Sequence, residues 1–194
     1  MGDFETHFTV VYDDRLPEWA DRLGLKYTRI RLDRGACADQ PMLTSTGRGD
    51  LPEQRAAAGA LVALLQRDGF TVRRVKIEAA PWHACVPVEP GPTGGCYFEH
   101  HVKLVLADGQ LDLVRSVAEG HGAHLSRNAR RVRDDGRHER FVTQRCRDVG
   151  RPQARERLDA LLSALAGAGL DAVEVEEEYV VVDDNPGLDA GWIR

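Results

Sequence analysis

Two segments of the chain repeat the same alternation of apolar and polar residues. Residues 4–10 and 98–104 both read Phe-Glu-x-His and then continue apolar, polar, apolar. A period of two is typical of a β-strand that buries one face. The alternation places the phenylalanines on the buried face and His7 and His101 on the opposite, polar face. We therefore expect each half of the chain to begin with a strand that presents a histidine.

The same order of elements follows in both halves. The pattern predicts helices at 16–23, 53–68, 111–121 and 152–168, and further strands at 26–32, 42–46, 71–79, 124–127, 141–145 and 172–182. The longer helices end at Gly69 and Gly169, where glycine commonly caps a helix. A threonine, Thr44 or Thr143, occurs in the third strand of each half. Each half is a β-α-β-β-α-β unit, which is the ferredoxin-like pattern. We predict an α+β protein formed by tandem duplication of this unit, with two sheets packed in pseudo-twofold symmetry.

This repeat divides the chain into four parts. The first repeat spans 1–80 and is followed by a linker rich in proline and glycine at 81–95. The second repeat spans 96–182, and a C-terminal tail follows at 183–194. The linker has no helical or strand period, so we expect irregular chain at the surface. The alternative to an irregular linker is a structural zinc site, with His83, Cys85 and Cys96 as three of the ligands. The tail ends in Trp192-Ile193, a large apolar pair that we expect to be packed, with a role that the sequence leaves open.

Composition narrows the class of protein. The chain is 42% hydrophobic and 29% charged, as in soluble globular proteins, and its formal net charge of −5 argues against a general nucleic-acid binder. No apolar run approaches the roughly 20 residues of a membrane span. Four scattered cysteines indicate free thiols in a cytoplasmic protein rather than a disulfide framework. A small-molecule ligand is the expected partner, and a homo-oligomer is left open.

The polar faces carry the candidate chemistry. Alternation in the last strand of each half turns Glu78 and Glu178 to the same face as the histidines. The first and last strands of this unit usually lie side by side, so each histidine should be close to the glutamate of its own half. If the two faces meet, His7, Glu78, His101 and Glu178 form a cluster. Imidazole with carboxylate suits a divalent transition metal that keeps open positions for a substrate.

The leading hypothesis is that the protein is a metal-dependent enzyme that acts on a small molecule. The expected substrate is anionic, phosphorylated or carboxylated, and binds in a cleft between the repeats. We expect a divalent metal ion as cofactor and a catalytic role for His7, His101 and Lys103. The substrate-binding candidates are Arg74, Lys76, Arg145, Glu5 and Glu99. A non-catalytic protein that binds an anionic ligand in the same cleft is the alternative. Cross-strand pairing of charged side chains on a solvated face would also produce this pattern.

Two partial resemblances bear on this site. A first-strand histidine and a last-strand glutamate in each of two modules are similar to the vicinal oxygen chelate superfamily, which implies metal ligation by His7, Glu78, His101 and Glu178. The chain departs from that superfamily by having a second helix in each half. His7-Phe8-Thr9-Val10 resembles the His-apolar-Thr motif of the two-histidine phosphoesterases, which implies a hydrolase. His101-Val102-Lys103-Leu104 departs from that motif at Lys103.

Overall fold

The computed structural model describes residues 3–130 and 133–193, so the first repeat and the tail extend slightly beyond the described residues. These residues form a mixed α/β protein with eight antiparallel strands in one sheet and four α-helices. The elements are β1 (Phe4–Val10), α1 (Leu16–Arg22), β2 (Lys26–Leu32), β3 (Asp39–Gly47), α2 (Leu51–Arg67), β4 (Val72–Ala79), β5 (Tyr97–Leu106), α3 (Leu111–Gly120), β6 (Ala123–Asn128), β7 (His138–Cys146), α4 (Arg151–Gly167), β8 (Ala172–Asp183) and a final 3₁₀ turn, η1 (Pro186–Asp189).

The eight strands close into one barrel, in the order β1-β3-β2-β6-β7-β5-β8-β4. Two packed sheets were expected, and this expectation is corrected by the pairing of β2 with β6 and of β4 with β8. Each half contributes four consecutive strands, and its two edge strands pair with the edge strands of the other half. Closure satisfies backbone groups that two separate sheets would leave unpaired. The polar faces of both halves consequently surround one interior, which we call the lumen.

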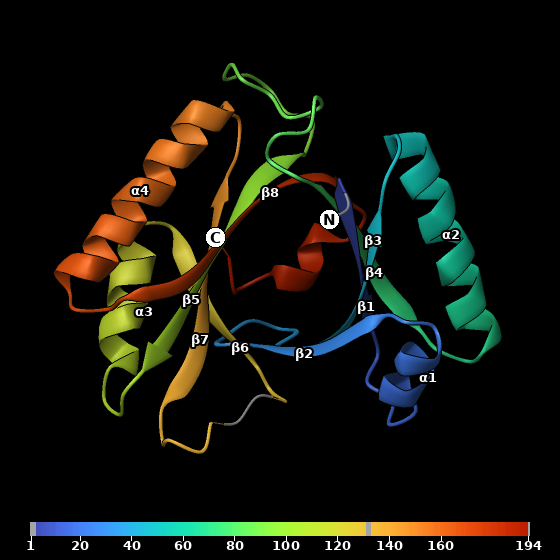
Figure 1. Ribbon diagram of the computed structural model, residues 1–194, viewed down its shortest axis with the longest axis horizontal. Helices are drawn as coiled ribbons and strands as arrows, with labels where there is room; N and C mark the ends of the chain where they lie inside the picture. Colours follow the sequence, from blue (N-terminus) through green and yellow to red (C-terminus); the bar gives the residue numbers. More distant parts are fainter. Residues whose placement is uncertain (1–2, 131–132, 194) are drawn as a thin grey trace.

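The helices cover the outside of the barrel. Figure 1 shows α1 and α2 on one side of the strands and α3 and α4 on the other, with η1 between them. One apolar cluster includes Phe4, Phe8 and Leu65, and a second includes Leu158 and Leu161 of α4. The apolar face of each strand thus packs under helices, as the period of two requires, and its polar face is left for the lumen.

The segment between the halves contains neither helix nor strand from Ala80 to Cys96. His83 Nδ1 lies 3.0 Å from Cys85 Sγ, whereas Cys96 Sγ lies 3.6 Å from the carbonyl oxygen of Val181. Among the described residues, the groups of side chains that could hold a metal ion do not include these three. All four cysteines are free thiols. No helix of the described chain is both long and apolar enough to span a membrane.

The linker is fastened to the start of α4. The backbone nitrogen of Arg151 donates a hydrogen bond of 2.8 Å to the carbonyl oxygen of Pro87. A Cβ atom on Gly150 would lie 2.0 Å from the carbonyl oxygen of Val88. The absence of a side chain at this residue is therefore what lets the linker backbone approach the helix.

We expect Gly150→Ala to lower the free energy of unfolding by about 1–3 kcal/mol, because the added methyl group forces the linker away from α4. Urea unfolding followed by circular dichroism measures the change. Gly59→Ala is the control: this exposed glycine of α2 has nothing within 4 Å of an added Cβ, so alanine should leave stability unchanged or raise it. Equal stability of Gly150→Ala and wild type would contradict the close approach.

Candidate functional site

The lumen contains a cavity of about 280 Å³ lined by side chains from all eight strands. The polar residues on its wall come from the alternate positions that face away from the helices. The polar side chains on this wall include Glu5, His7, Thr44, Arg74, Lys76, Glu99, His101, Lys103, Thr143, Arg145, Glu174, Glu178 and Asp189. The cavity is large enough for a small molecule, and its wall is polar and charged.

His7 is held between two neighbouring strands. Its Nδ1 is 2.9 Å from Thr44 Oγ1, and its Nε2 is 2.6 Å from Glu78 Oε2. The pairing of β1 with β3 sets His7 directly opposite Thr44. The threonine therefore fixes the ring orientation from one side and leaves Nε2 to face the carboxylates.

His101 repeats this arrangement in the second half. Its Nδ1 is 3.0 Å from Thr143 Oγ1, and β5 and β7 pair with these two residues opposite each other. Its Nε2 lies 3.4 Å from both Glu99 Oε1 and Glu178 Oε2. The threonines were visible in the sequence at equivalent strands, but only the pairing register shows that they orient the histidines.

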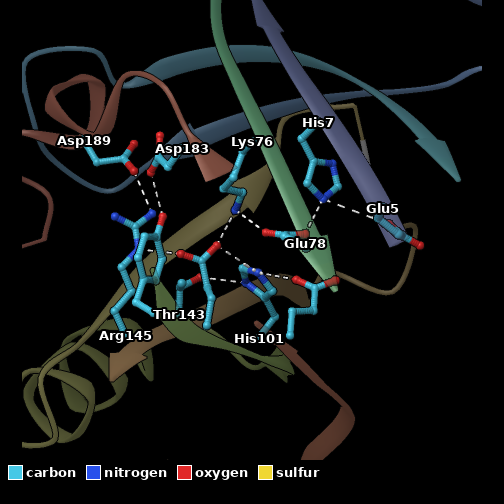
Figure 2. A network of polar contacts seen from close by, with 12 residues as sticks. Glu5, His7, Lys76, Glu78, His101, Thr143, Arg145, Asp183 and Asp189 are labelled. Atoms are coloured by element: carbon cyan, nitrogen blue, oxygen red, sulfur yellow. Dashed lines mark hydrogen bonds and ion pairs between the residues drawn. The ribbon is translucent and has the colours of Figure 1, made fainter. Parts of the chain in front are cut away.

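The carboxylates of the two halves meet beside these rings. In Figure 2, Glu5 and Glu78 of the first half lie beside His7, and His101 of the second half lies nearby. Two groups each place three potential ligand atoms within 4.8 Å of one another: Glu5 with His7 and Glu178, and Glu78 with His101 and Glu178. The structure thus brings together all four residues named as metal ligands from the sequence. It adds Glu5, which the sequence suggested for substrate binding.

Burial and mutual interactions shift the proton affinities of this cluster. Burial raises the pKa of Glu178 to about 7, with the charge of Glu78 adding to the effect. Burial alone would lower the pKa of His101, but hydrogen bonds to Glu178 and Glu99 raise it to about 10. Burial opposes ionisation of Glu78 as well, yet Lys76 and His7 hold its pKa well below the usual range. The cluster therefore contains closely spaced negative charge that has to be compensated locally.

Lys76 provides part of that compensation. Its Nζ lies 2.5 Å from Glu78 Oε1 and also contacts Glu99 Oε1. No hydrogen bond of good geometry accompanies the contact with Glu78 Oε1, so the contact is mainly an ion pair. We expected Lys76 and Glu99 to bind substrate, but both are buried and committed to internal partners. A substrate would have to displace one of these partners.

Glu99 connects the Lys76 ion pairs to a second set of ion pairs, formed by Arg145 and Arg74. The guanidinium of Arg145 contacts Glu99 Oε2 and lies 2.7 Å from Asp189 Oδ2. Arg74 pairs with Asp183 at 2.5 Å and with Asp189 at 2.8 Å. Arg74 and Arg145 were also substrate-binding candidates, and the structure places each of them between two carboxylates. Their positive charge is therefore already neutralised within the protein.

The C-terminal tail enters this network, and the sequence did not show this. Asp189 is only 3% exposed, and its Oδ1 accepts a hydrogen bond of 2.9 Å from Gln40 Nε2. The buried indole of Trp192 donates from Nε1 to the carbonyl oxygen of Leu125 at 2.8 Å. Both side chains line the cavity, so the tail forms part of the lumen wall. The apolar Trp192-Ile193 pair at the end of the chain was the only signal for this packing.

Lys103 and Glu5 are the candidates with the weakest internal pairing. Lys103 Nζ is 3.4 Å from Glu174 Oε2, a side chain that is 53% exposed. The Glu5 side chain is 43% exposed, and its Oε2 is 4.0 Å from His7 Nε2. Both residues line the cavity and are able to move toward a ligand without breaking a buried ion pair.

We expect Asp189→Asn to lower the free energy of unfolding by about 3 kcal/mol near pH 7, because it leaves two buried arginines short of a counter-charge. Attraction to Arg74 and Arg145 outweighs burial and lowers the pKa of Asp189 in the folded state. The stabilisation by Asp189 is therefore present above the unfolded pKa of about 3.9 and is lost as pH falls below it.

Urea unfolding between pH 3 and pH 7 should show the difference between wild type and Asp189→Asn shrinking on the acid side. Asp108→Asn serves as the control, because the Asp108 side chain is 89% exposed and pairs with the exposed His138. This change should stay within about 0.5 kcal/mol. A penalty for Asp189→Asn no larger than that of the control would contradict the role of the tail.

Comparisons with known proteins do not place the chain in a family. No family model matches, and no curated protein gives a significant match. Among solved structures, the chain is similar to the small subunit of acetolactate synthase from Thermotoga maritima at 12% identity and a TM-score of 0.27, covering 93% of this chain and 94% of that one. A protein of unknown function from Galdieria sulphuraria gives 16% identity and a TM-score of 0.28, covering 90% and 96%. TM-scores this low carry no argument about fold or activity.

Proposed function

We propose that the protein is a metal-dependent enzyme that acts on a small molecule inside the barrel. A divalent transition-metal ion would be held by His7, Glu78, His101 and Glu178. The observation that carries this proposal is the convergence of two imidazole Nε2 atoms and the carboxylates of both halves in one cavity wall.

The donor set fits such an ion. Imidazole nitrogen with carboxylate oxygen is the ligand combination that zinc, iron and related divalent ions accept. When Nε2 ligates a metal, Nδ1 carries the proton and donates it to an acceptor behind the ring. Thr44 Oγ1 and Thr143 Oγ1 occupy that position at 2.9 and 3.0 Å. Both rings are therefore oriented for ligation by Nε2.

The charge balance of the lumen also favours a cation. Arg74, Lys76 and Arg145 are paired with Asp183, Asp189, Glu78 and Glu99. The remaining charged wall consists of four glutamates, Glu5, Glu174, Glu176 and Glu178, two lysines, Lys26 and Lys103, and His101, whose raised pKa of about 10 makes it cationic at neutral pH. A divalent cation would balance this excess of carboxylate, and the cost of retaining it falls mainly on Glu178, whose side chain is 18% exposed.

We propose an anionic, phosphorylated or carboxylated substrate, as expected from the sequence, but with a different mode of binding. The arginines and Lys76 are held in ion pairs, so the substrate oxygen would be held at the cluster and Lys103 would contact the negative charge. A bound divalent ion supplies Lewis-acid polarisation of such an oxygen. The barrel wall encloses the cavity in part, and partial exclusion of water would strengthen these electrostatic contacts.

Two rival functions use the same residues. A non-catalytic binding protein would hold the anionic ligand in this cavity without turning it over, and assays of the metal-loaded protein with phosphate and carboxylate esters distinguish it from an enzyme. A two-histidine phosphoesterase would need both Nε2 atoms available to a bare phosphate. Here each Nε2 faces carboxylates, at 2.6 Å for His7 and at 3.4 Å for His101, and these would repel a phosphate. The geometry favours the metal.

The two halves are proposed to derive from a tandem duplication of a ferredoxin-like unit. The order β-α-β-β-α-β occurs twice, and each half carries a histidine held by a threonine on the paired strand. A shared origin explains why a site at the junction contains equivalent residues from each half.

Metal analysis of the purified protein tests the proposal. We expect near-stoichiometric divalent metal after reloading with Zn²⁺ or Mn²⁺ and dialysis, and at least a tenfold loss of affinity in His7→Ala and His101→Ala, because each removes one nitrogen ligand. His138→Ala is the matched control, since this exposed histidine lies outside the lumen and should retain full binding. A wild-type protein that holds no metal would contradict the proposal.

The threonines provide a second, independent test. Thr44→Val and Thr143→Val keep the side-chain shape but remove the hydroxyl acceptor behind each imidazole. We expect each change to weaken metal affinity by about 10- to 100-fold, as measured by competition with a coloured chelator. Thr71→Val, a change at an exposed threonine outside the eight strands, should have no effect. Unchanged affinity in both lumen variants would show that the threonines do not position the ligands.

A further inference from the structure

We propose that the cluster binds two divalent ions rather than one, with Glu178 as the carboxylate that bridges them. This inference rests on the proposed metal function and makes it more specific. Its basis is that the potential ligands form two separate groups of three, which have only Glu178 in common.

The first ion site consists of Glu78, His101 and Glu178. His101 Nε2 lies 3.4 Å from Glu178 Oε2, and the Glu78 carboxylate is 1% exposed. Ligand atoms bound at about 2.0–2.2 Å to one ion stand roughly 3 Å apart. His101 Nε2 and Glu178 Oε2 are already close to that separation, and Glu78 completes the site once one of its oxygens leaves His7 or Lys76.

The second ion site consists of Glu5, His7 and Glu178. His7 Nε2 lies 4.0 Å from Glu5 Oε2, and the Glu5 side chain is 43% exposed. Closing this gap to the separation found around a metal takes a shift of about 1 Å, which an exposed glutamate makes at little cost. The partner of His7 in this group is therefore Glu5, a residue that a single-ion site at the four predicted ligands would leave unused.

Glu178 has the position and the chemistry of a bridge. It belongs to β8, and the two groups of potential ligands share it. Glu78 also lies near both histidines, but its two oxygens are already engaged by Lys76 and His7. A carboxylate has two oxygens, so it can donate one to each ion. Two-metal sites hold their ions about 3.5–4 Å apart, a separation that such a bridge spans.

The charges of the two sites agree with this assignment and specify the ligand. Glu5, Glu78 and Glu178 bring three negative charges, and Glu78 shares one of its oxygens with Lys76. Two divalent ions would leave positive charge uncompensated. An oxyanion of the substrate, such as a phosphate or carboxylate group, would balance it by contacting both ions.

The two sites differ in their access to solvent. A second cavity of about 650 Å³ adjoins the lumen and shares Glu5, Glu176 and Glu178 with it. Glu5 of the second ion site lines both cavities and is 43% exposed, whereas Glu78 of the first ion site is 1% exposed. The ion held by Glu5 and His7 should therefore exchange faster and be lost first on dialysis against a weak chelator.

Metal counting combined with electron paramagnetic resonance tests the inference. The protein is stripped, reloaded with Mn²⁺, dialysed and analysed for manganese per chain. We expect two ions in wild type with the spectrum of an exchange-coupled pair, and one ion with an uncoupled spectrum in Glu5→Gln. Glu178→Gln should abolish the coupling. Glu174→Gln, a change at a cavity glutamate outside both groups, should retain two coupled ions.

The outcomes separate the two proposals. One ion per chain in wild type, unchanged in Glu5→Gln, would overturn the two-ion site and leave the metal-dependent function standing. No ion in wild type would overturn both. Two ions without magnetic coupling would remove Glu178 as the bridge. Inorganic phosphate is then added as a probe, and it should perturb the coupled spectrum of wild type but not the spectrum of Glu5→Gln.

Discussion

The structure depends on the pairing of β4 with β8, which joins the two halves at their last strands. This pairing and its counterpart between β2 and β6 close the barrel and turn two polar sheet faces toward each other. It brings Glu78 of the first half to the strand that carries Glu178. Without closure, each histidine would face solvent with one glutamate. With closure, the two pairs come together in one cluster.

A charged lumen has an energetic cost, because carboxylates and ammonium groups lose hydration when a barrel encloses them. The protein offsets this cost with a continuous series of ion pairs. Arg74 and Arg145 share Asp189, Arg145 and Lys76 share Glu99, and Lys76 reaches Glu78. The tail completes the series by supplying Asp189. Stability and site geometry are thereby linked, since the residues that neutralise the interior also hold the edge of the proposed metal cluster.

Part of the lumen is left with more carboxylate than cation, and this part holds the two histidines. Carboxylates that the protein's own cations do not neutralise favour metal binding, because the ion then has no internal cation to displace. The lumen is divided in this way. The region around Arg74 and Arg145 is neutralised by ion pairs, and the region around Glu5 and Glu178 is acidic. The proposed oxyanion substrate would then bind to the ions rather than to the arginines.

The sequence alone determined the local structure and the faces of the strands. The strand predicted at 26–32 is β2 (Lys26–Leu32), the helix predicted at 53–68 is α2 (Leu51–Arg67), and the strand predicted at 42–46 extends to β3 (Asp39–Gly47). Periodicity is a property of neighbouring residues, so it was sufficient to place His7, Glu78, His101 and Glu178 on polar faces. The tertiary structure decided that these faces enclose one lumen and that Glu5 joins the cluster. It also decided the ion pairs, in which Asp183, Asp189 and Glu99 hold the side chains of Arg74, Lys76 and Arg145. Strand-edge pairing and ion pairing act between residues far apart in the chain. Local periodicity therefore does not determine which distant strand edge or charged side chain becomes the partner.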